Sequence, residues 1–424
     1  MNKRNDYFPM QESLLCEDYV VATYLLKVPK SDSSLKHAIE IAIDQTTGTW
    51  TPVPEETEEV KIGHRARTIE VHEISNTDSE DYKSCIIKIA FPHINFGPSL
   101  AMLFSTVIGN NSSMGYIKLI DLTFPEKYVK NFKGCKFGVE GIRDILKIYD
   151  RPLLCNMIKP CTGIPPETGA KLAYKAAVGG ADMIKDDELL ADTEFSHIQE
   201  RVSYFIKELK KADEIKGEKT LYMLNITDSP DKMVEHALRA IDAGANALMI
   251  NYLTVGFDAV RMISENKNIQ VPILGHCTMS GALSAAAYQG IDISLLLGKI
   301  PRMMGLDSVL VYTPGGRFLL EEDKYVQIVN ELLQKFYDLK QVFPLPGGSI
   351  HPGTVEYLVN LTGKDCIISA GGGIHGHPYG PTAGAKAMRQ AIELAMTDPS
   401  KRGEKEKEFK EFQVAIETWG KKTV

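Results

Sequence analysis

The chain has 424 residues, a formal net charge of −7, and 44% hydrophobic and 24% charged residues. The negative charge argues against nucleic acid or an anionic membrane as the main partner. No apolar run approaches the roughly 18 residues of a membrane-spanning helix, and we expect no secretory signal. Seven scattered cysteines without zinc-site spacing fit a reducing cytoplasm. The length predicts two domains, or a large barrel with one extra domain.

The first third of the chain mixes strand and helix patterns without a regular repeat. Strands are expected at 19–28 and 84–90, and helices at 35–44 and 97–108. We therefore predict that residues 1–145 form an α+β, ferredoxin-like domain.

Residues 146–424 have a different pattern, in which short apolar runs alternate with helical stretches. The expected strands are 153–158, 181–184, 220–225, 247–251, 272–274, 309–312, 341–345 and 366–370. The expected helices between and after them are 166–178, 199–211, 231–243, 280–297, 321–340 and 380–396. About eight strand–helix units in this length predict a (β/α)8 barrel. A doubly wound open sheet is the alternative.

Polar residues follow several of these strands. Lys159 follows the first, Lys185-Asp186-Asp187-Glu188 the second and His276 the fifth, while glycine-rich turns at 347–349 and 371–373 follow the last two. Because the carboxyl ends of barrel strands meet at one face, we expect these residues to share one mouth. The glycine turns could hold a phosphate through backbone N–H groups, or they could simply be turns.

The run 185–188 is the most informative of these features. A strand alternates its side chains, so Lys185 and Asp187 point to one side, and Glu188 can swing in from the loop. Oxygen donors at a strand end suit Mg2+. Lys185 could join them only as a carbamate formed with CO2. The alternative is a solvated charge run.

Taken together, the motifs resemble the large chain of ribulose-bisphosphate carboxylase/oxygenase (RuBisCO) and, more closely, its RuBisCO-like relatives. The resemblance rests on 18–25 (DYVVATYL), 47–51 (TGTWT), 108–110 (IGN), 136–138 (KFG), 158–160 (IKP), 179–188 (GGADMIKDDE), 371–378 (GGGIHGHP) and 383–385 (AGA).

The resemblance implies a role for each matching residue. Lys185 would be the carbamylated lysine that holds Mg2+ with Asp187 and Glu188, Lys159 the general base, and His276 a residue of the substrate site. The positions that hold one substrate phosphate would be Thr49, Trp50, Gly348, Ser349, Gly371 and Gly372. The family's site combines two subunits of a homodimer, so Thr49, Trp50 and Asn110 would act across the interface. Trp50 could alternatively belong to a core.

Several departures from the family pattern bear on the activity. Cys277 replaces the arginine that follows the active-site histidine, and the histidine at the sixth strand end is also replaced. A thiol cannot reproduce the charged contact of a guanidinium, so a monophosphate is favoured over a bisphosphate. The loop 313–317 lacks the lysine of true carboxylases, and Cys161 stands where RuBisCO has another lysine. These changes argue against CO2 fixation.

The chain is also similar to the 2,3-diketo-5-methylthiopentyl-1-phosphate enolases of methionine salvage, particularly through 118–122, 136–143 and 371–378. The resemblance implies that those enolases use a base lysine where this chain has Asn110, and that they lack the lysine at Lys159. The reversed pattern here indicates a sister branch with another substrate.

The main hypothesis is therefore Mg2+-dependent enolisation or isomerisation of a phosphorylated ketose-like substrate, with Lys159 as the base. Its pKa would have to fall from about 10.4 toward neutrality. The alternatives are the methionine-salvage enolase, a decarboxylase or hydrolase of a phosphorylated oxo-acid, and a non-catalytic binding protein. We expect structural roles for His351, His375 and His377, and inert buried thiols at Cys161 and Cys277.

Overall fold

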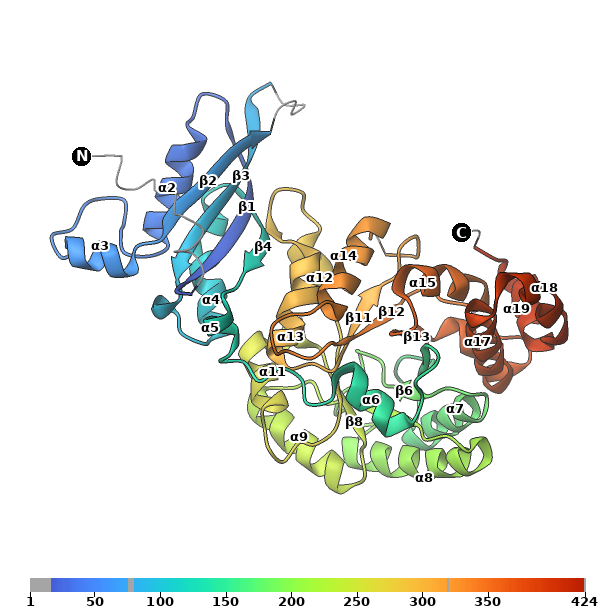
Figure 1. The fold of residues 1–424 in the computed structure, drawn as a ribbon. Helices are drawn as coiled ribbons and strands as arrows, with labels where there is room; N and C mark the ends of the chain where they lie inside the picture. Colours follow the sequence, from blue (N-terminus) through green and yellow to red (C-terminus); the bar gives the residue numbers. More distant parts are fainter. Residues whose placement is uncertain (1–16, 75–79, 319, 423–424) are drawn as a thin grey trace. The chain divides into compact units, whose positions relative to one another are not determined.

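The computed structural model describes residues 17–74, 80–318 and 320–422, and it divides into two compact units (Figure 1). The first contains residues up to 133 together with 279–296, and the second contains 134–278 and the chain from 297 onward. Among the described residues, no helix is long and apolar enough to cross a membrane. Cys16 lies outside the described residues, and the six described cysteines form no disulfide.

The first unit is built on a five-stranded sheet in the order β10-β4-β1-β3-β2. Its strands are β1 (Tyr19–Pro29), β2 (Arg67–Ile74), β3 (Tyr82–Pro92), β4 (Tyr116–Thr123) and β10 (Gly290–Ile291). The main helices of this unit are α2 (Ser34–Asp44), α3 (Glu58–His64), α4 (Leu100–Val107), α5 (Glu126–Val129) and α12 (Ser280–Ser284). Alternate residues of the central strand β1 are buried, from Val20 to Val28, because one face of the sheet packs on the core. The predicted α+β class is confirmed.

The expectation of a barrel helix at 280–297 is wrong. The chain forms the short α12, then β10, which pairs in parallel with β4 and belongs to the first unit. Gly290 has φ +86°, which lies outside the right-handed helical region, and a Cβ there would lie 2.1 Å from the carbonyl oxygen of Leu283, so this bend requires glycine. Lys118 Nζ donates to the carbonyl oxygens of Ser284 (2.8 Å) and Ala286 (2.7 Å), which satisfies the end of α12.

The second unit is a closed barrel of eight parallel strands in the order β11-β12-β13-β5-β6-β7-β8-β9. The strands are β5 (Leu153–Met157), β6 (Met183–Lys185), β7 (Leu221–Asn225), β8 (Ala247–Ile250), β9 (Ile273–Gly275), β11 (Ser308–Tyr312), β12 (Phe343–Gly347) and β13 (Ile367–Ala370). Every residue of β7, β8, β12 and β13 is buried, as expected for parallel strands covered on both faces. The predicted (β/α)8 barrel is confirmed, and the open sheet is excluded.

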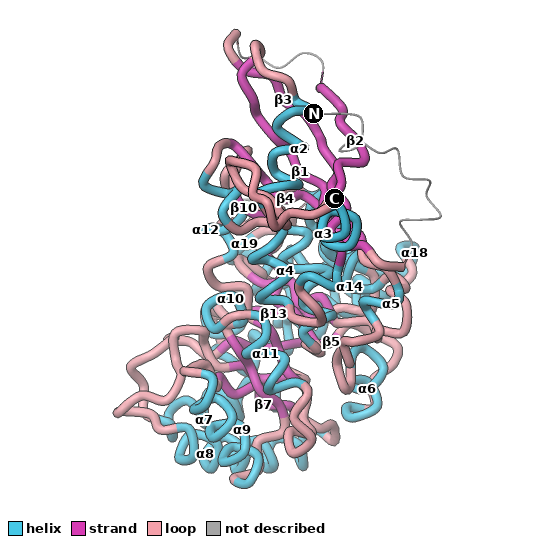
Figure 2. Tube along the Cα trace, turned by 90° about the vertical axis from the view of Figure 1, so that its left-hand side faces the viewer, coloured by secondary structure: helices cyan, strands magenta, loops and turns pink. Residues whose placement is uncertain are grey.

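Helices surround these strands (Figure 2). In chain order they are α6 (Gly138–Leu146), α7 (Pro166–Val178), α8 (Ile198–Lys216), α9 (Pro230–Asp242), α10 (Tyr252–Val255), α11 (Phe257–Ser264), α13 (Ile300–Met304), α14 (Glu322–Leu333), α15 (Val355–Thr362), α16 (Gly372–His375), α17 (Gly380–Met396), α18 (Pro399–Glu408) and α19 (Lys410–Trp419). The helix α18 covers most of the lysine- and glutamate-rich run 401–410, and it buries none of its residues.

A buried carboxylate secures the start of β6. Asp182 is fully buried and accepts two hydrogen bonds from Arg151 (2.7 and 2.8 Å), one from Arg389 of α17 (3.0 Å) and one from the backbone N–H of Leu154 (2.8 Å). Burial acts to raise the pKa of Asp182, but the guanidinium of Arg151 outweighs it and the pKa is held below its ordinary value. This network joins β5, β6 and α17, and so it fixes the strand that carries Lys185.

Replacing Asp182 with asparagine should cost about 3–5 kcal/mol of unfolding free energy at neutral pH, because Arg151 and Arg389 lose their shared anion. The lowered pKa means that the contribution is complete above the unfolded-state pKa of about 3.9 and is lost as the pH falls through the folded-state value. Urea unfolding of wild type and Asp182→Asn should therefore differ constantly above about pH 5 and converge at lower pH. The exposed Asp338→Asn variant is the control, and a difference that widens in acid would contradict the assignment.

Candidate active site

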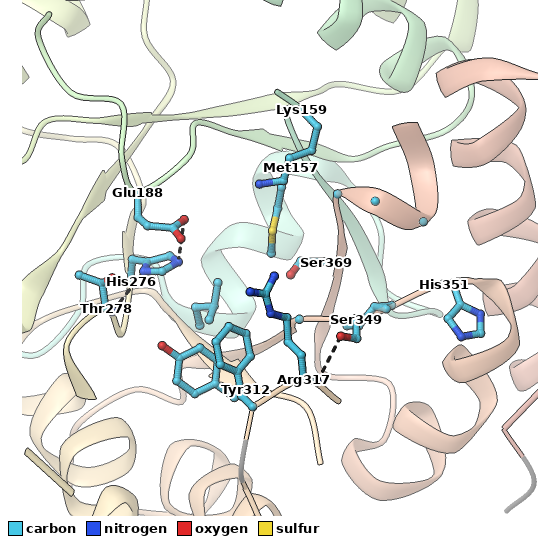
Figure 3. Close-up of a pocket in the computed structure, with 18 of the residues that line it drawn as sticks. Met157, Lys159, Glu188, His276, Thr278, Tyr312, Arg317, Ser349, His351 and Ser369 are labelled. Atoms are coloured by element: carbon cyan, nitrogen blue, oxygen red, sulfur yellow. Dashed lines mark hydrogen bonds and ion pairs between the residues drawn. The ribbon is translucent and has the colours of Figure 1, made fainter. Parts of the chain in front are cut away.

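The carboxyl ends of the barrel strands surround a cavity of about 640 Å³ (Figure 3). The proposed site residues that line it are Lys159, Glu188, His276, Gly348, Ser349, Gly371 and Gly372. Lys185 and Asp187 are buried against this set and contact Glu188 and Lys159 respectively. The barrel mouth therefore brings together the predicted lysines, carboxylates, histidine and glycine turns.

Lys185 ends β6 and is completely buried. Its Nζ donates to the carbonyl oxygen of Asp186 at 2.6 Å, and the nearest carboxylate oxygen, Oε2 of Glu188, lies 3.6 Å away. A buried ammonium usually has a closer anionic partner, because burying a charge costs free energy unless it is paired. The burial of this amine is therefore only partly offset by its two contacts, one with a carbonyl oxygen and one with a more distant carboxylate.

Asp186 points the other way, as strand alternation requires. It accepts hydrogen bonds from Arg201 Nε (3.1 Å), Tyr222 OH (2.6 Å) and the backbone N–H of Asn225 (3.1 Å), all behind the strand. The side-chain amide of Asn251 donates to the carbonyl oxygen of Glu188 at 2.9 Å. These contacts hold the turn after β6, so that its other side chains face the cavity.

Lys159 is paired with a carboxylate in this structure. Its Nζ donates to Asp187 Oδ2 at 2.6 Å and to Cys161 Sγ at 2.9 Å. Burial acts to lower the pKa of Lys159, but the contacts with Asp187 and Cys161 together outweigh it and the pKa is raised. The lowering that a base needs is therefore absent while Asp187 pairs with Lys159. The expectation that the Cys161 thiol is buried is wrong, because Cys161 is partly exposed, and its sulfur contacts this amine.

His276 follows β9 and is almost fully buried. Burial, reinforced by Lys185 and Lys159, holds its pKa well below the ordinary value, so the ring is neutral. The backbone N–H of Thr278 donates to Nδ1 (3.2 Å), which leaves the proton on Nε2, 3.3 Å from Glu188 Oε2. His276 can therefore donate to Glu188 and fix its orientation.

The glycine turns make close backbone approaches. Gly348 has φ +101°, and a Cβ there would lie 2.9 Å from the ring of Phe318. A Cβ on Gly371 would lie 2.9 Å from Cε of Lys159, so this glycine makes room for the lysine. The hydroxyl of Thr313 donates a hydrogen bond to the carbonyl oxygen of Gly348. The turns are thus tied to Lys159 and to the loop after β11.

Several cavity residues carried no sequence motif that would reveal them, namely Met157, Tyr312, Arg317, Phe318 and Trp419. Trp419 lies at the end of α19, remote in the chain from any strand end. Arg317 lies in the loop that sequence reasoning considered only for its missing lysine. Because side chains alternate along a strand, Met157, two residues before Lys159, could have been predicted to lie on the same face.

The three additional histidines differ from one another. His351 accepts from the backbone N–H of Gly353 (3.2 Å) and also lines the cavity. His377 accepts from the N–H of Tyr379 (3.1 Å) and contacts the carbonyl oxygen of Glu411 (3.0 Å), which is a structural role. His375 Nε2 is buried without a partner in the described part of the chain, and burial, reinforced by Lys159, lowers its pKa to about 4.

Thr49, Trp50 and Asn110 belong to the first unit. Trp50 is 91% exposed in the loop after α2, so the alternative that it is a core residue is wrong. Asn110 begins a 3-10 turn, Asn110–Ser113.

The residues at the mouth fit a divalent cation only if Lys185 contributes. In the described chain, no group of three His, Cys, Asp or Glu side chains is arranged to hold a metal ion. Asp187 and Glu188 supply two carboxylates, which are the oxygen ligands that Mg2+ prefers. A carbamate on Lys185 would supply the third anionic group at the place where the buried amine now has modest pairing. The donor set therefore fits Mg2+ together with CO2.

Two family models match the chain: the ribulose bisphosphate carboxylase large chain N-terminal domain over residues 5–128 and its catalytic domain over residues 138–419. A ribulose bisphosphate carboxylase-like protein from Archaeoglobus fulgidus is 47% identical over 392 residues, which are 91% of this chain and 90% of that protein. A 2,3-diketo-5-methylthiopentyl-1-phosphate enolase from Geobacillus thermodenitrificans is 38% identical over 95% of this chain and 98% of its own.

Among solved structures, a rubisco-like protein from Alicyclobacillus acidocaldarius superposes with a TM-score of 0.87 at 32% identity, covering 95% of this chain and 100% of that one. The chain belongs to the ribulose bisphosphate carboxylase large-chain family, with the RuBisCO-like proteins. Its N-terminal domain and closed barrel are those of the family's large subunit.

Comparing alanine substitutions at Gly348 and Gly363 should separate the cost of a steric clash from the cost of backbone strain in the free energy of unfolding. Gly363 also has a positive φ (+79°), but a Cβ there meets nothing within 4 Å, so Gly363→Ala is a matched control for strain. We expect Gly363→Ala to lose about 1–2 kcal/mol. Gly348→Ala should lose about 1–3 kcal/mol more, because its methyl group displaces Phe318. Denaturant unfolding measures both, and equal losses would show that the contact with Phe318 contributes nothing.

Proposed function

We propose that this protein is a RuBisCO-like enzyme that does not fix CO2 and that, with Mg2+, removes a proton next to the carbonyl of a phosphorylated ketose-like substrate. The observation that carries the proposal is the shared mouth of Lys159, Lys185, Asp187 and Glu188 beside two glycine turns. Such a set joins a candidate base, a candidate cation site and a candidate phosphate site within one cavity.

Lys185, Asp187 and Glu188 would hold the cation. The ammonium of Lys185 would first lose one proton. The neutral amine would then attack CO2, an N–C bond would form as one C=O π bond opens, and a second proton would leave to solvent, so that the side chain changes from a cation to an anion. When bound, Mg2+ supplies positive charge that stabilises the enediolate as it develops. The Nε2–H of His276 keeps Glu188 oriented, and the Asn251 amide holds the backbone of Glu188.

Lys159 would be the base once its contact with Asp187 opens. The ion pair at 2.6 Å favours the protonated amine. If Asp187 bound the cation instead, its carboxylate would no longer raise the pKa of Lys159. Burial, and positive charge nearby, then favour the neutral amine. The amine can take the proton from the carbon next to the substrate carbonyl, with the lysine stem packed against Gly371.

Gly348, Ser349, Gly371 and Gly372 would bind the substrate phosphate through their backbone. We further propose a homodimer in which Thr49, Trp50 and Asn110 of one subunit complete the partner's site. The support in this chain is the exposure of Trp50 (91%), because a large aromatic side chain left in water is typical of a surface that another molecule covers.

The departures at the second phosphate position also support a reaction other than CO2 fixation. Cys277 is fully buried and offers no charge there, and the loop 313–317 holds no lysine. The second candidate is the methionine-salvage enolase, which the relative from Geobacillus thermodenitrificans favours. A decarboxylase or hydrolase of a phosphorylated oxo-acid would use the same residues, with loss of CO2 in place of a proton.

Deuterium uptake tests the proposal. The protein with Mg2+ and bicarbonate in D2O should exchange hydrogen next to the carbonyl of at least one member of a panel of ketose 1-phosphates that includes 2,3-diketo-5-methylthiopentyl 1-phosphate, as NMR would show. Lys159→Met should lower the exchange at least about 10²-fold, the usual contribution of a general base, while Mg2+ binding remains. Lys171→Met, at an exposed site on α7, is the control. No exchange by protein that binds Mg2+, with CO2 released from phosphorylated oxo-acids, would favour decarboxylation.

Lys185→Ala should remove the dependence of activity on bicarbonate together with most of the turnover, because only two carboxylates then remain for the cation. Isothermal titration with Mg2+, in the presence and absence of bicarbonate, measures the binding directly. Bicarbonate should strengthen Mg2+ binding by wild type and leave the variant unchanged. Full turnover by Lys185→Ala would exclude the carbamate. Absence of Mg2+ binding by wild type would instead support a non-catalytic binding protein.

A further inference from the structure

Arg317 reaches into the cavity from the loop between β11 and α14 (Figure 3). Two buried arginines of this unit, Arg143 and Arg201, pair with carboxylates. Within the described part of the chain, no carboxylate lies within ion-pair distance of Arg317; its guanidinium lies over the ring of Phe318, 5.4 Å from the centroid. A guanidinium directed into a cavity without an anionic partner is suited to an anionic ligand.

Contacts on both sides hold the loop that carries Arg317. The backbone N–H of Arg317 donates to Ser349 Oγ at 3.2 Å, and that of Thr313 donates to the carbonyl oxygen of Gly347 at 3.1 Å. Lys422 Nζ donates to the carbonyl oxygen of Pro314 at 3.2 Å. The loop is therefore fastened to the glycine turn and to the C-terminal segment, which preorganises the guanidinium.

The surroundings of Arg317 increase the attraction of its guanidinium for an anion. Figure 3 shows the side chain extending toward Met157 and Ser369, with Glu188 on one side of the cavity and Ser349 on the other. Phe318 stacks on Tyr312, with ring centroids 4.1 Å apart, and covers one side of the guanidinium stem. Apolar walls lower the local dielectric constant and increase the attraction for an anion.

We infer that Arg317 binds a carboxylate on the substrate and so selects phosphorylated sugar acids. This inference rests on the proposed function, since it assigns a second anionic group of the same substrate. A single planar guanidinium matches a carboxylate through two parallel N–H bonds. Among the described residues that line the cavity, Arg317 is the single arginine, and one guanidinium matches the single charge of a carboxylate better than the two charges of a second phosphate.

Matched ligands test the inference without turnover. Each pair consists of an aldonate phosphate and its alditol phosphate, with four, five or six carbons, for example 6-phosphogluconate and glucitol 6-phosphate. The members of a pair differ only by a carboxylate in place of a hydroxymethyl group. Isothermal titration should show that wild type binds at least one aldonate phosphate about tenfold or more tightly than its partner, as expected for a charge-assisted bidentate contact.

Arg317→Gln should abolish that preference and leave the affinity for alditol phosphates within about twofold, because the phosphate turn is intact. Arg239→Gln, at an exposed site on α9, controls for the loss of one positive charge, and unfolding curves check that both variants fold. Arg317→Lys should restore only part of the preference. No preference in wild type, or a preference that Arg317→Gln retains, would overturn the inference while leaving the phosphate site intact. Failure of every phosphate ester to bind would contradict the proposed function itself.

Discussion

A buried lysine amine at the end of a barrel strand is the constraint on which this site depends. Lys185 is fully buried, and the Asp182 network before it and the Asp186–Arg201–Tyr222 network behind it fix the strand in place. The amine is therefore held beside Glu188, which lines the cavity, with one carbonyl oxygen at 2.6 Å and a carboxylate oxygen of Glu188 at 3.6 Å. A modestly paired buried cation is costly, and its conversion to an anion that shares a divalent cation with Asp187 and Glu188 would relieve that cost.

The same constraint couples the cation site to the proposed base. Asp187 pairs with Lys159 at 2.6 Å and raises its pKa, so one carboxylate serves the base in this structure and would serve the cation in the active enzyme. The amine of Lys159 would become available only as the cation site is completed. This exchange of partners would link the deprotonation of the proposed base to the assembly of the proposed metal site. It would also explain how a lysine whose pKa is raised in this structure could later act as a neutral amine.

The barrel could be predicted from the sequence because each buried parallel strand is an apolar run bounded by helical patterns, and its strand ends are marked by polar residues such as Lys159 and His276. The segment 280–297 could not, since its helix ends at Ser284, Gly290 takes a positive φ, and the strand that follows pairs with the distant β4. Arg317 and Trp419 were missed because tertiary packing of a loop and a C-terminal helix brings them to the cavity. The raised pKa of Lys159 likewise arises from Asp187, whose approach only the closed barrel reveals.

The most direct test of the central claim is 13C NMR of the protein with Mg2+ and 13C-labelled bicarbonate. The account predicts a carbamate carbon resonance that depends on Mg2+, is absent from Lys185→Ala, and is retained in Lys159→Met. Mg2+ bound to wild-type protein without any carbamate resonance would contradict the claim that Lys185 supplies the third ligand, and with it the proposed coupling between the cation site and the base.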